Sequence, residues 1–195
     1  MEQTTLIATF YSFEPFVIAA HASSPSRIIL VIDEEKESSI KDALDKVDEF
    51  YGNVAKIERV KVKGSDLYEI SKKAVELLES ATGRVVVYVG GGKKLTSQGV
   101  LYGCYARPEL VSRILCNNVN DNTIVELPKL TFELSSAKKR LLKELVNKNG
   151  RSVADIAKVL DKTRAIVYQH LKDLKGLGYV DEKFQITMAG KLAML

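Results

Sequence analysis

The sequence predicts an α/β domain built on a mainly parallel sheet, closed by an antiparallel hairpin and followed by a smaller, mostly helical domain. Apolar runs of strand length recur through the first two thirds of the chain, and segments with helical spacing lie between them. From residue 135 onward the pattern is almost purely helical. Strands that alternate with helices are typical of right-handed βαβ units in one open, Rossmann-like sheet.

Four apolar runs are predicted as strands of the parallel sheet. The third run alternates and has one polar face, whereas the fourth is almost entirely apolar. Near-continuous apolar strands are expected in a parallel sheet that is covered on both faces. In chain order the runs are Thr4–Phe10, Arg27–Asp33, Ala55–Lys63 and Arg84–Gly90.

Helices are predicted between the strands, and a hairpin after them. The helical segments, the second with Ser65 as its N-cap, are Glu34–Tyr51, Asp66–Ser80 and Lys93–Ala106. The runs Val111–Asn117 and Thr123–Pro128 follow one another without a helix, which indicates a closing antiparallel hairpin. We therefore expect a first domain at residues 1–128, a linker at 129–134 and a second domain at 135–195.

The charge is distributed unevenly along the chain. Residues 135–195 carry 13 Lys and Arg against 6 Asp and Glu, a net +7, whereas the first 134 residues carry 16 against 19, a net −3. A basic module predicts an anionic partner, which is either nucleic acid or a membrane surface. No apolar run approaches the roughly 20 residues of a bilayer span, and no basic leader precedes one, so the expected location is the cytoplasm.

Two short helices define the second domain. Val153–Leu160 and Arg164–Lys175 have helical spacing, and the segments 179–181 and 184–187 alternate as two short strands. Two helices joined by a tight turn and followed by a hairpin make a winged helix-turn-helix. This part of the chain resembles the ArsR- and MarR-type regulators of bacteria and archaea. The run that carries the resemblance is VADIAKVLDKTRAIVYQHLKDLKGLGYVDEKFQIT.

The second of these helices is predicted to enter the major groove of DNA with its N-terminal half toward the bases. Arg164 is expected to reach guanine or phosphate, and Gln169 to reach adenine. The predicted DNA contacts are Ser152, Thr163, Arg164, Ala165, Ile166, Gln169, Lys172 and Lys183. The alternative is a winged helix that binds only protein. The apolar side chain of Ile166 and the acidic residues nearby keep that alternative open.

Polar segments follow the first and fourth strands, at the edge where open α/β sheets bind ligands. The segment after the fourth strand, at residues 90–98, reads GGGKKLTSQ and opens a helix whose amides attract an anion. It suits a phosphodiester or a nucleotide, although it has neither P-loop nor GxGxxG spacing. The alternative is a tight turn without a ligand. Cys104 and Cys116 are interpreted as small core side chains.

The order of these features resembles the CRISPR-associated Rossmann fold (CARF) family, in particular the archaeal CARF–winged-helix transcription factors of CRISPR loci. The resemblance rests on the glycine-lysine loop after the fourth strand, a final hairpin ending in Leu127-Pro128, and the C-terminal winged helix. It implies a homodimer whose two CARF domains share one pocket for a cyclic oligoadenylate, cyclic tetra-adenylate in particular. Carried over by position, the ligand contacts are Ser12, Phe13, Glu14, Gly90, Gly91, Gly92, Lys93, Lys94, Thr96, Ser97 and Gln98.

Together these features predict a transcriptional regulator of CRISPR-associated genes that binds double-stranded DNA and responds to a cyclic oligoadenylate. We expect no catalytic residue, cofactor or metal. One alternative is an enzyme that cleaves the ring in the same pocket with Ser12, Lys93, Lys94 and Thr96. The motifs offer no histidine as general base, and His21 is expected to be structural. The other alternative is a dimeric scaffold that binds DNA without any ligand.

Overall fold

The computed structural model describes residues 3–118, 121, 123–130, 134–146 and 152–195. The chain divides into two compact units, residues 1–131 and 132–195. Among the described residues, no helix combines the length and the apolar character that crossing a membrane requires. The sequence also predicts that a helix starting near Ser135 stops at Asn149-Gly150, and this pair lies outside the described residues.

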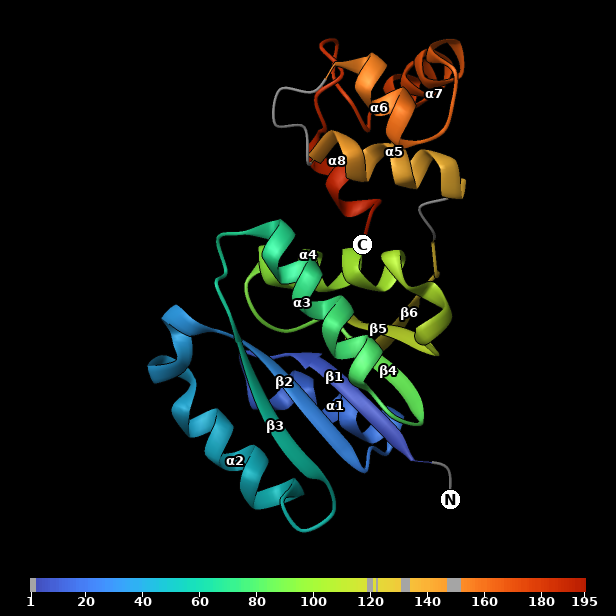
Figure 1. The fold of residues 1–195 in the computed structure, drawn as a ribbon. Coiled ribbons are helices and arrows are strands. Elements are labelled where there is room, and N and C mark those ends of the chain that lie inside the picture. The colour runs from blue at the N-terminus through green and yellow to red at the C-terminus, as the bar shows by residue number, and fades with distance from the viewer. Residues whose placement is uncertain (1–2, 119–120, 122, 131–133, 147–151) are drawn as a thin grey trace. The chain divides into compact units, whose positions relative to one another are not determined.

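Six strands of the first unit form one sheet in the order β3-β2-β1-β4-β5-β6 (Figure 1). The strands are β1 (Thr4–Thr9), β2 (Arg27–Asp33), β3 (Lys56–Val62), β4 (Arg84–Tyr88), β5 (Arg113–Asn118) and β6 (Thr123–Leu127). β1 to β5 are parallel, and β6 pairs antiparallel with β5. The predicted fold class is therefore confirmed, including the closing hairpin.

Two hydrophobic cores lie on opposite faces of this sheet, because successive side chains of a strand point to opposite sides. In β2, Ile28, Leu30 and Ile32 belong to one core, and Ile29 and Val31 belong to the other. Four helices cover the two faces (Figure 1): α1 (Phe13–Ser23) and α2 (Lys41–Tyr51) on the first, α3 (Leu67–Ser80) and α4 (Lys94–Ala106) on the second. Covering on both faces explains why the strand sequences are almost continuously apolar.

Two helix starts differ from the sequence-based expectation. The N-cap of α3 is Asp66, not Ser65, since the Asp66 carboxylate accepts hydrogen bonds from the backbone amides of Tyr68 and Glu69. The segment expected as one helix from Glu34 begins as a 3₁₀ helix, η1 (Glu34–Ile40), and becomes α-helical in α2. A second 3₁₀ helix, η2 (Pro108–Leu110), precedes β5.

Within its described residues, the second unit contains four helices and one hydrophobic core. The helices are α5 (Ser136–Val146), α6 (Val153–Val159), α7 (Arg164–Gly176) and α8 (Met188–Leu192). Leu141, Leu142 and Leu145 of α5 pack with Ile156 of α6 and with the inner face of α7. The inner face of α7 is formed by Val167, Leu171 and Leu174, as its helical spacing predicted.

The wing is shorter than expected. In place of the two strands predicted at 179–181 and 184–187, a single antiparallel bridge joins Val180 to Ile186. The reason is local, because the Asp181 carboxylate accepts hydrogen bonds from the backbone amides of Lys183 and Gln185. Phe184 adopts a left-handed conformation with φ +54°. This tight turn takes up the residues that would otherwise extend the ladder.

Close packing of α4 on α3 gives a test of the fold. A Cβ atom added at Gly103 would lie 2.6 Å from the Cβ of Ala74 and 3.0 Å from the carbonyl oxygen of Ser71. We expect Gly103→Ala to lower the free energy of unfolding by about 1–3 kcal/mol, because the two helices must move apart. Gly176→Ala at the end of α7 is the matched control. A Cβ there meets nothing within 4 Å, and alanine favours the helix by up to about 1 kcal/mol.

Urea unfolding of the two variants, followed by circular dichroism, measures both effects. Equal losses in the two variants would contradict the close α3–α4 contact.

Candidate ligand site and nucleic-acid interface

The strand order reverses between β1 and β4, which are adjacent although two strands separate them in sequence. Open α/β sheets bind ligands at such a point, beyond the carboxyl ends of the strands. The segment after β1 starts at Phe10, and the glycine loop starts at Gly90 after β4. The two segments touch, because a Cβ on Gly91 would lie 3.4 Å from the Cα of Phe10.

The glycine loop is fastened to the end of β1 by hydrogen bonds. The Gly91 amide donates to Thr9 Oγ1 over 3.2 Å, and Thr9 Oγ1 lies 3.3 Å from Ser97 Oγ. The Ser97 hydroxyl donates to the Gly91 carbonyl. Any side chain on Gly91 would overlap the carbonyl of Thr9, and Gly92 has φ +81°. Both glycines are thus required by the loop itself, and Ser97 bonds within it.

Helix α4 begins directly after this loop, and among the described residues no side chain caps it and no acidic residue lies in its first turn. Its first amides are therefore available to an anion. Lys94 and Gln98 are exposed. Thr96 is only 1% exposed, and within the described part of the chain its hydroxyl has no hydrogen-bond partner. A buried hydroxyl without a partner is uncommon in native proteins.

Lys93 is held by two carboxylates that the sequence reasoning did not single out. Its Nζ lies 2.9 Å from Asp33 Oδ2 and 3.0 Å from Glu35 Oε2. The neighbouring carboxylates, Asp33 more strongly than Glu35, raise the pKa of Lys93. Asp33 ends β2 and is buried, and Glu35 lies in η1. The sequence feature that could have indicated these two residues is an acidic run directly after an apolar strand, at the carboxyl ends of the strands.

The three ligand contacts predicted after β1 have different surroundings in the structure. Ser12 is the N-cap residue of α1 and makes no capping hydrogen bond with its side chain. Phe13 packs against Phe50 of α2, with 5.2 Å between ring centroids. Glu14 is exposed in the first turn of α1, where a carboxylate is stabilised by the helix dipole. His21 is exposed in the last turn of that helix.

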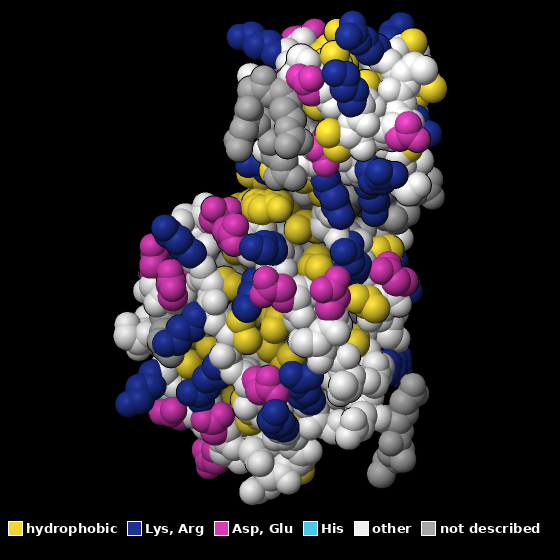
Figure 2. All heavy atoms as spheres, viewed as in Figure 1, with side chains coloured by type: hydrophobic (Ala, Val, Ile, Leu, Met, Phe, Trp, Pro, Cys, Tyr) yellow, Lys and Arg dark blue, Asp and Glu magenta, His cyan; other side chains and the backbone are white. Residues whose placement is uncertain are grey.

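The predicted DNA contacts on α7 are all exposed, and all except Lys172 lie at its N-terminal half. Thr163 caps the helix, with its Oγ1 accepting from the Ile166 amide over 3.3 Å. Arg164, Ala165, Ile166 and Gln169 are exposed, as are Lys172 on the same helix and Lys183 in the wing. Figure 2 shows, on the face that it draws, Lys and Arg spread over the C-terminal unit with fewer Asp and Glu between them.

Two of these predicted contacts are engaged in bonds of their own. The Gln169 amide nitrogen donates to Asp173 Oδ1 over 2.9 Å, and Lys138 Nζ lies 2.9 Å from Asp173 Oδ2. The hydrogen bond from Lys138 and, to a smaller extent, that from Gln169 lower the pKa of Asp173. Ser152 forms a capping box with Asp155, whose carboxylate lies at the start of α6. A phosphate at Ser152 would meet that negative charge.

Tyr168 is a candidate contact residue on α7 that the sequence-based prediction did not include. Its side chain is 51% exposed, and its ring lies 6.4 Å from that of Phe184 in the wing. Because Tyr168 is four residues after Arg164, the two share one side of α7. This i, i+4 spacing from Arg164 is the sequence feature that could have indicated Tyr168.

The comparisons with known proteins give a family match for the C-terminal unit. Residues 135–182 match the family described as "Bacterial regulatory protein, arsR family". The C-terminal domain is an ArsR-type helix-turn-helix. No curated protein matches the chain.

Solved structures resemble the fold at low sequence identity. VC1899 from Vibrio cholerae has a TM-score of 0.51 and 12% identity, over 97% of this chain and 56% of that one. Can2 from Sulfobacillus thermosulfidooxidans, in complex with cyclic tetra-adenylate, gives 0.49 and 12% over the same shares of 97% and 56%. The chain thus spans little more than half the length of either. The likeness to VC1899 shows that the fold is shared, and the family match at residues 135–182 confirms the predicted resemblance to ArsR-type regulators.

Two buried threonines at the glycine loop provide a matched test. Thr9→Val removes a hydroxyl that bonds to the loop and leaves the Gly91 amide without its acceptor, so we expect a loss of about 1–3 kcal/mol in unfolding free energy. Thr96→Val removes a hydroxyl without a partner, so we expect no loss, or a gain of about 1 kcal/mol. Chemical denaturation measures both. A Thr96→Val loss as large as that of Thr9→Val would show that the Thr96 hydroxyl is bonded.

Proposed function

We propose that this protein is a ligand-responsive transcriptional regulator of CRISPR-associated genes. In this proposal it binds double-stranded DNA through the ArsR-type helix-turn-helix and a cyclic oligoadenylate, cyclic tetra-adenylate in particular, at the interface of a homodimer. The single observation that carries the proposal is the combination, in one chain, of an uncapped helix start with a glycine loop at the strand reversal and a DNA-binding module.

The DNA side of the proposal assigns roles on α7. Arg164 reads guanine or contacts phosphate, and Gln169 reads adenine after releasing Asp173. Lys172 and Lys183 contact phosphates on either side of the groove. The net +7 of residues 135–195 supports nucleic acid as the partner.

The ligand side of the proposal centres on the amides at the start of α4. A phosphodiester there accepts from these amides, and Lys94 adds positive charge. The Thr96 hydroxyl, which has no partner among the described residues, is a donor suited to such a ligand. Lys93 contributes by exchanging one of its carboxylate partners for a phosphate, since Asp33 and Glu35 hold it now.

Support for a homodimer comes from α1, whose sequence FEPFVIAAHAS is apolar on nearly all sides. Helices of this kind are usually buried on all sides. Val17 and Ile18 are half-exposed and lie outside the core cluster that contains Phe16, Ala19 and Ala20. A two-fold dimer would cover them, and it would suit a ring with matching halves. The ring acts on DNA binding only through different affinities for two dimer states.

The DNA assignment predicts a sequence-dependent effect of Arg164→Ala. Selection from a random duplex library should yield a preferred site, and the variant should bind it at least about 10-fold more weakly, with relaxed preference at one position. Lys72→Ala on α3 removes an exposed cation from the other unit and should leave the affinity unchanged. Electrophoretic mobility shift measures both. Enrichment of no sequence would contradict DNA reading and leave a winged helix that binds protein.

The ligand assignment predicts binding of one cyclic tetra-adenylate per two chains in a calorimetric titration. Glu35→Gln should tighten binding about two- to fivefold, since it releases Lys93 from an ion pair at an exposed carboxylate. Glu34→Gln is the matched control, because Lys93 is paired with Glu35 and Asp33 and not with this neighbour. Absence of heat with the wild-type chain would overturn the ligand assignment. A linear oligoadenylate in the calorimeter cell after the titration would favour the ring-cleaving alternative.

A further inference from the structure

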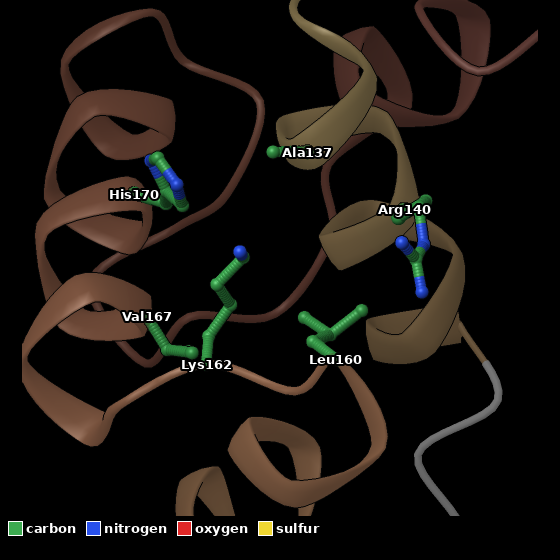
Figure 3. A pocket seen from close by; sticks show the side chains of 6 residues that line it. All are labelled: Ala137, Arg140, Leu160, Lys162, Val167 and His170. Atoms are coloured by element: carbon green, nitrogen blue, oxygen red, sulfur yellow. The ribbon is translucent and has the colours of Figure 1, made fainter.

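A small cavity of about 30 Å³ lies in the C-terminal unit, between α5, the turn that precedes α7, and α7 itself (Figure 3). Three apolar and three nitrogen-bearing side chains line it: Ala137, Leu160, Val167, Arg140, Lys162 and His170. Its volume suits one or two atoms of the size of a water oxygen. This cavity is called the α5–α7 cleft below.

The α5–α7 cleft carries positive charge that its surroundings do not neutralise. Arg140 and Lys162 are exposed, and neither has an ion pair with any residue that the structure describes. The Nδ1 atom of His170 is shut off from water and, within the described ranges, has no hydrogen-bond partner. The acidic residue one turn away, Asp173, is already bound by Lys138 and Gln169.

The cleft also borders the side of α7 that is assigned to DNA. His170 lies four residues after Ile166, so the two side chains are neighbours along one flank of the helix. Ile166 is 42% exposed and belongs to the N-terminal half that faces the groove. Lys162 directly precedes Thr163, the N-cap of the same helix. A DNA strand beside α7 therefore passes close to the mouth of the cleft.

We propose that the α5–α7 cleft binds one phosphate of the DNA backbone. Arg140 and Lys162 contact its anionic oxygens, and the His170 imidazole donates a hydrogen bond to one of them. The proposal rests on the proposed DNA-binding function and adds a contact outside the recognition residues. A phosphate contact fixes the position of the protein on the duplex without reading sequence. It therefore acts equally on specific and non-specific sites.

The test measures how affinity depends on salt. For Arg140→Gln and Lys162→Gln in the full-length chain, affinity should fall by a similar factor on the preferred duplex and on an unrelated one. In the double variant Arg140→Gln/Lys162→Gln, which loses the phosphate contact, the slope of log affinity against log salt should become shallower by about 0.9. Lys143→Gln is the matched control, since Lys143 is an exposed cation of α5 that does not line the cleft. It should leave the slope unchanged.

Inorganic phosphate distinguishes the source of the anion. A phosphate-induced shift of the His170 ring signals in NMR, lost in the double Arg140→Gln/Lys162→Gln variant, with changed DNA slopes supports the backbone contact. The same shift with unchanged slopes assigns the cleft to a free anion and overturns the proposal. Unchanged slopes without any shift also overturn it. Failure of the wild-type chain to bind any duplex would overturn the proposed DNA function together with this contact.

Discussion

The parallel pairing of β1 with β4 is the constraint on which the first unit depends. It joins two halves of the sheet that the chain builds outward in opposite directions, with Thr4 opposite Arg84 and Ala8 opposite Tyr88. Both strands are buried on both faces, so a shift in register would misplace apolar side chains in two cores at once. The same pairing brings the glycine loop against the end of β1, where Thr9 binds it.

At the carboxyl ends of the strands, a loop fixed by hydrogen bonds lies next to hydrogen-bond donors that have no partner among the described residues. Thr9, Gly91 and Ser97 bond to one another and fix the loop. Beyond them, the start of α4 has no side-chain cap within the described residues, and the Thr96 hydroxyl is buried without a partner there. Lys93 is paired with the carboxylates of Asp33 and Glu35. Rigid backbone beneath unmatched donors is the arrangement that binding an anion with little reorganisation requires.

In the second unit, packing and capping fix the recognition helix while leaving its outer side available. Val167, Leu171 and Leu174 anchor α7 in the core, and Thr163 fixes its start. The charges around it are partly paired within the unit, as Gln169 and Lys138 on Asp173 show. In the proposed function, DNA binding through this surface would exchange internal hydrogen bonds for contacts to bases and phosphates, which favours specificity over raw affinity.

The sequence by itself determined the strands of the sheet, their order along the chain and the helices between β2 and β5, because apolar periodicity follows directly from which faces are buried. It also located the glycine loop and α7, whose residue types carry their chemistry locally. The short wing was missed, since the Asp181 turn and the conformation of Phe184 depend on backbone geometry. The ion pairs of Lys93 with Asp33 and Glu35 were missed as well, and so was the α5–α7 cleft. Asp33 is 60 residues before Lys93, and Arg140 is 22 before Lys162. Only the tertiary structure decides which distant charges meet, because pairing of side chains across elements depends on how those elements pack.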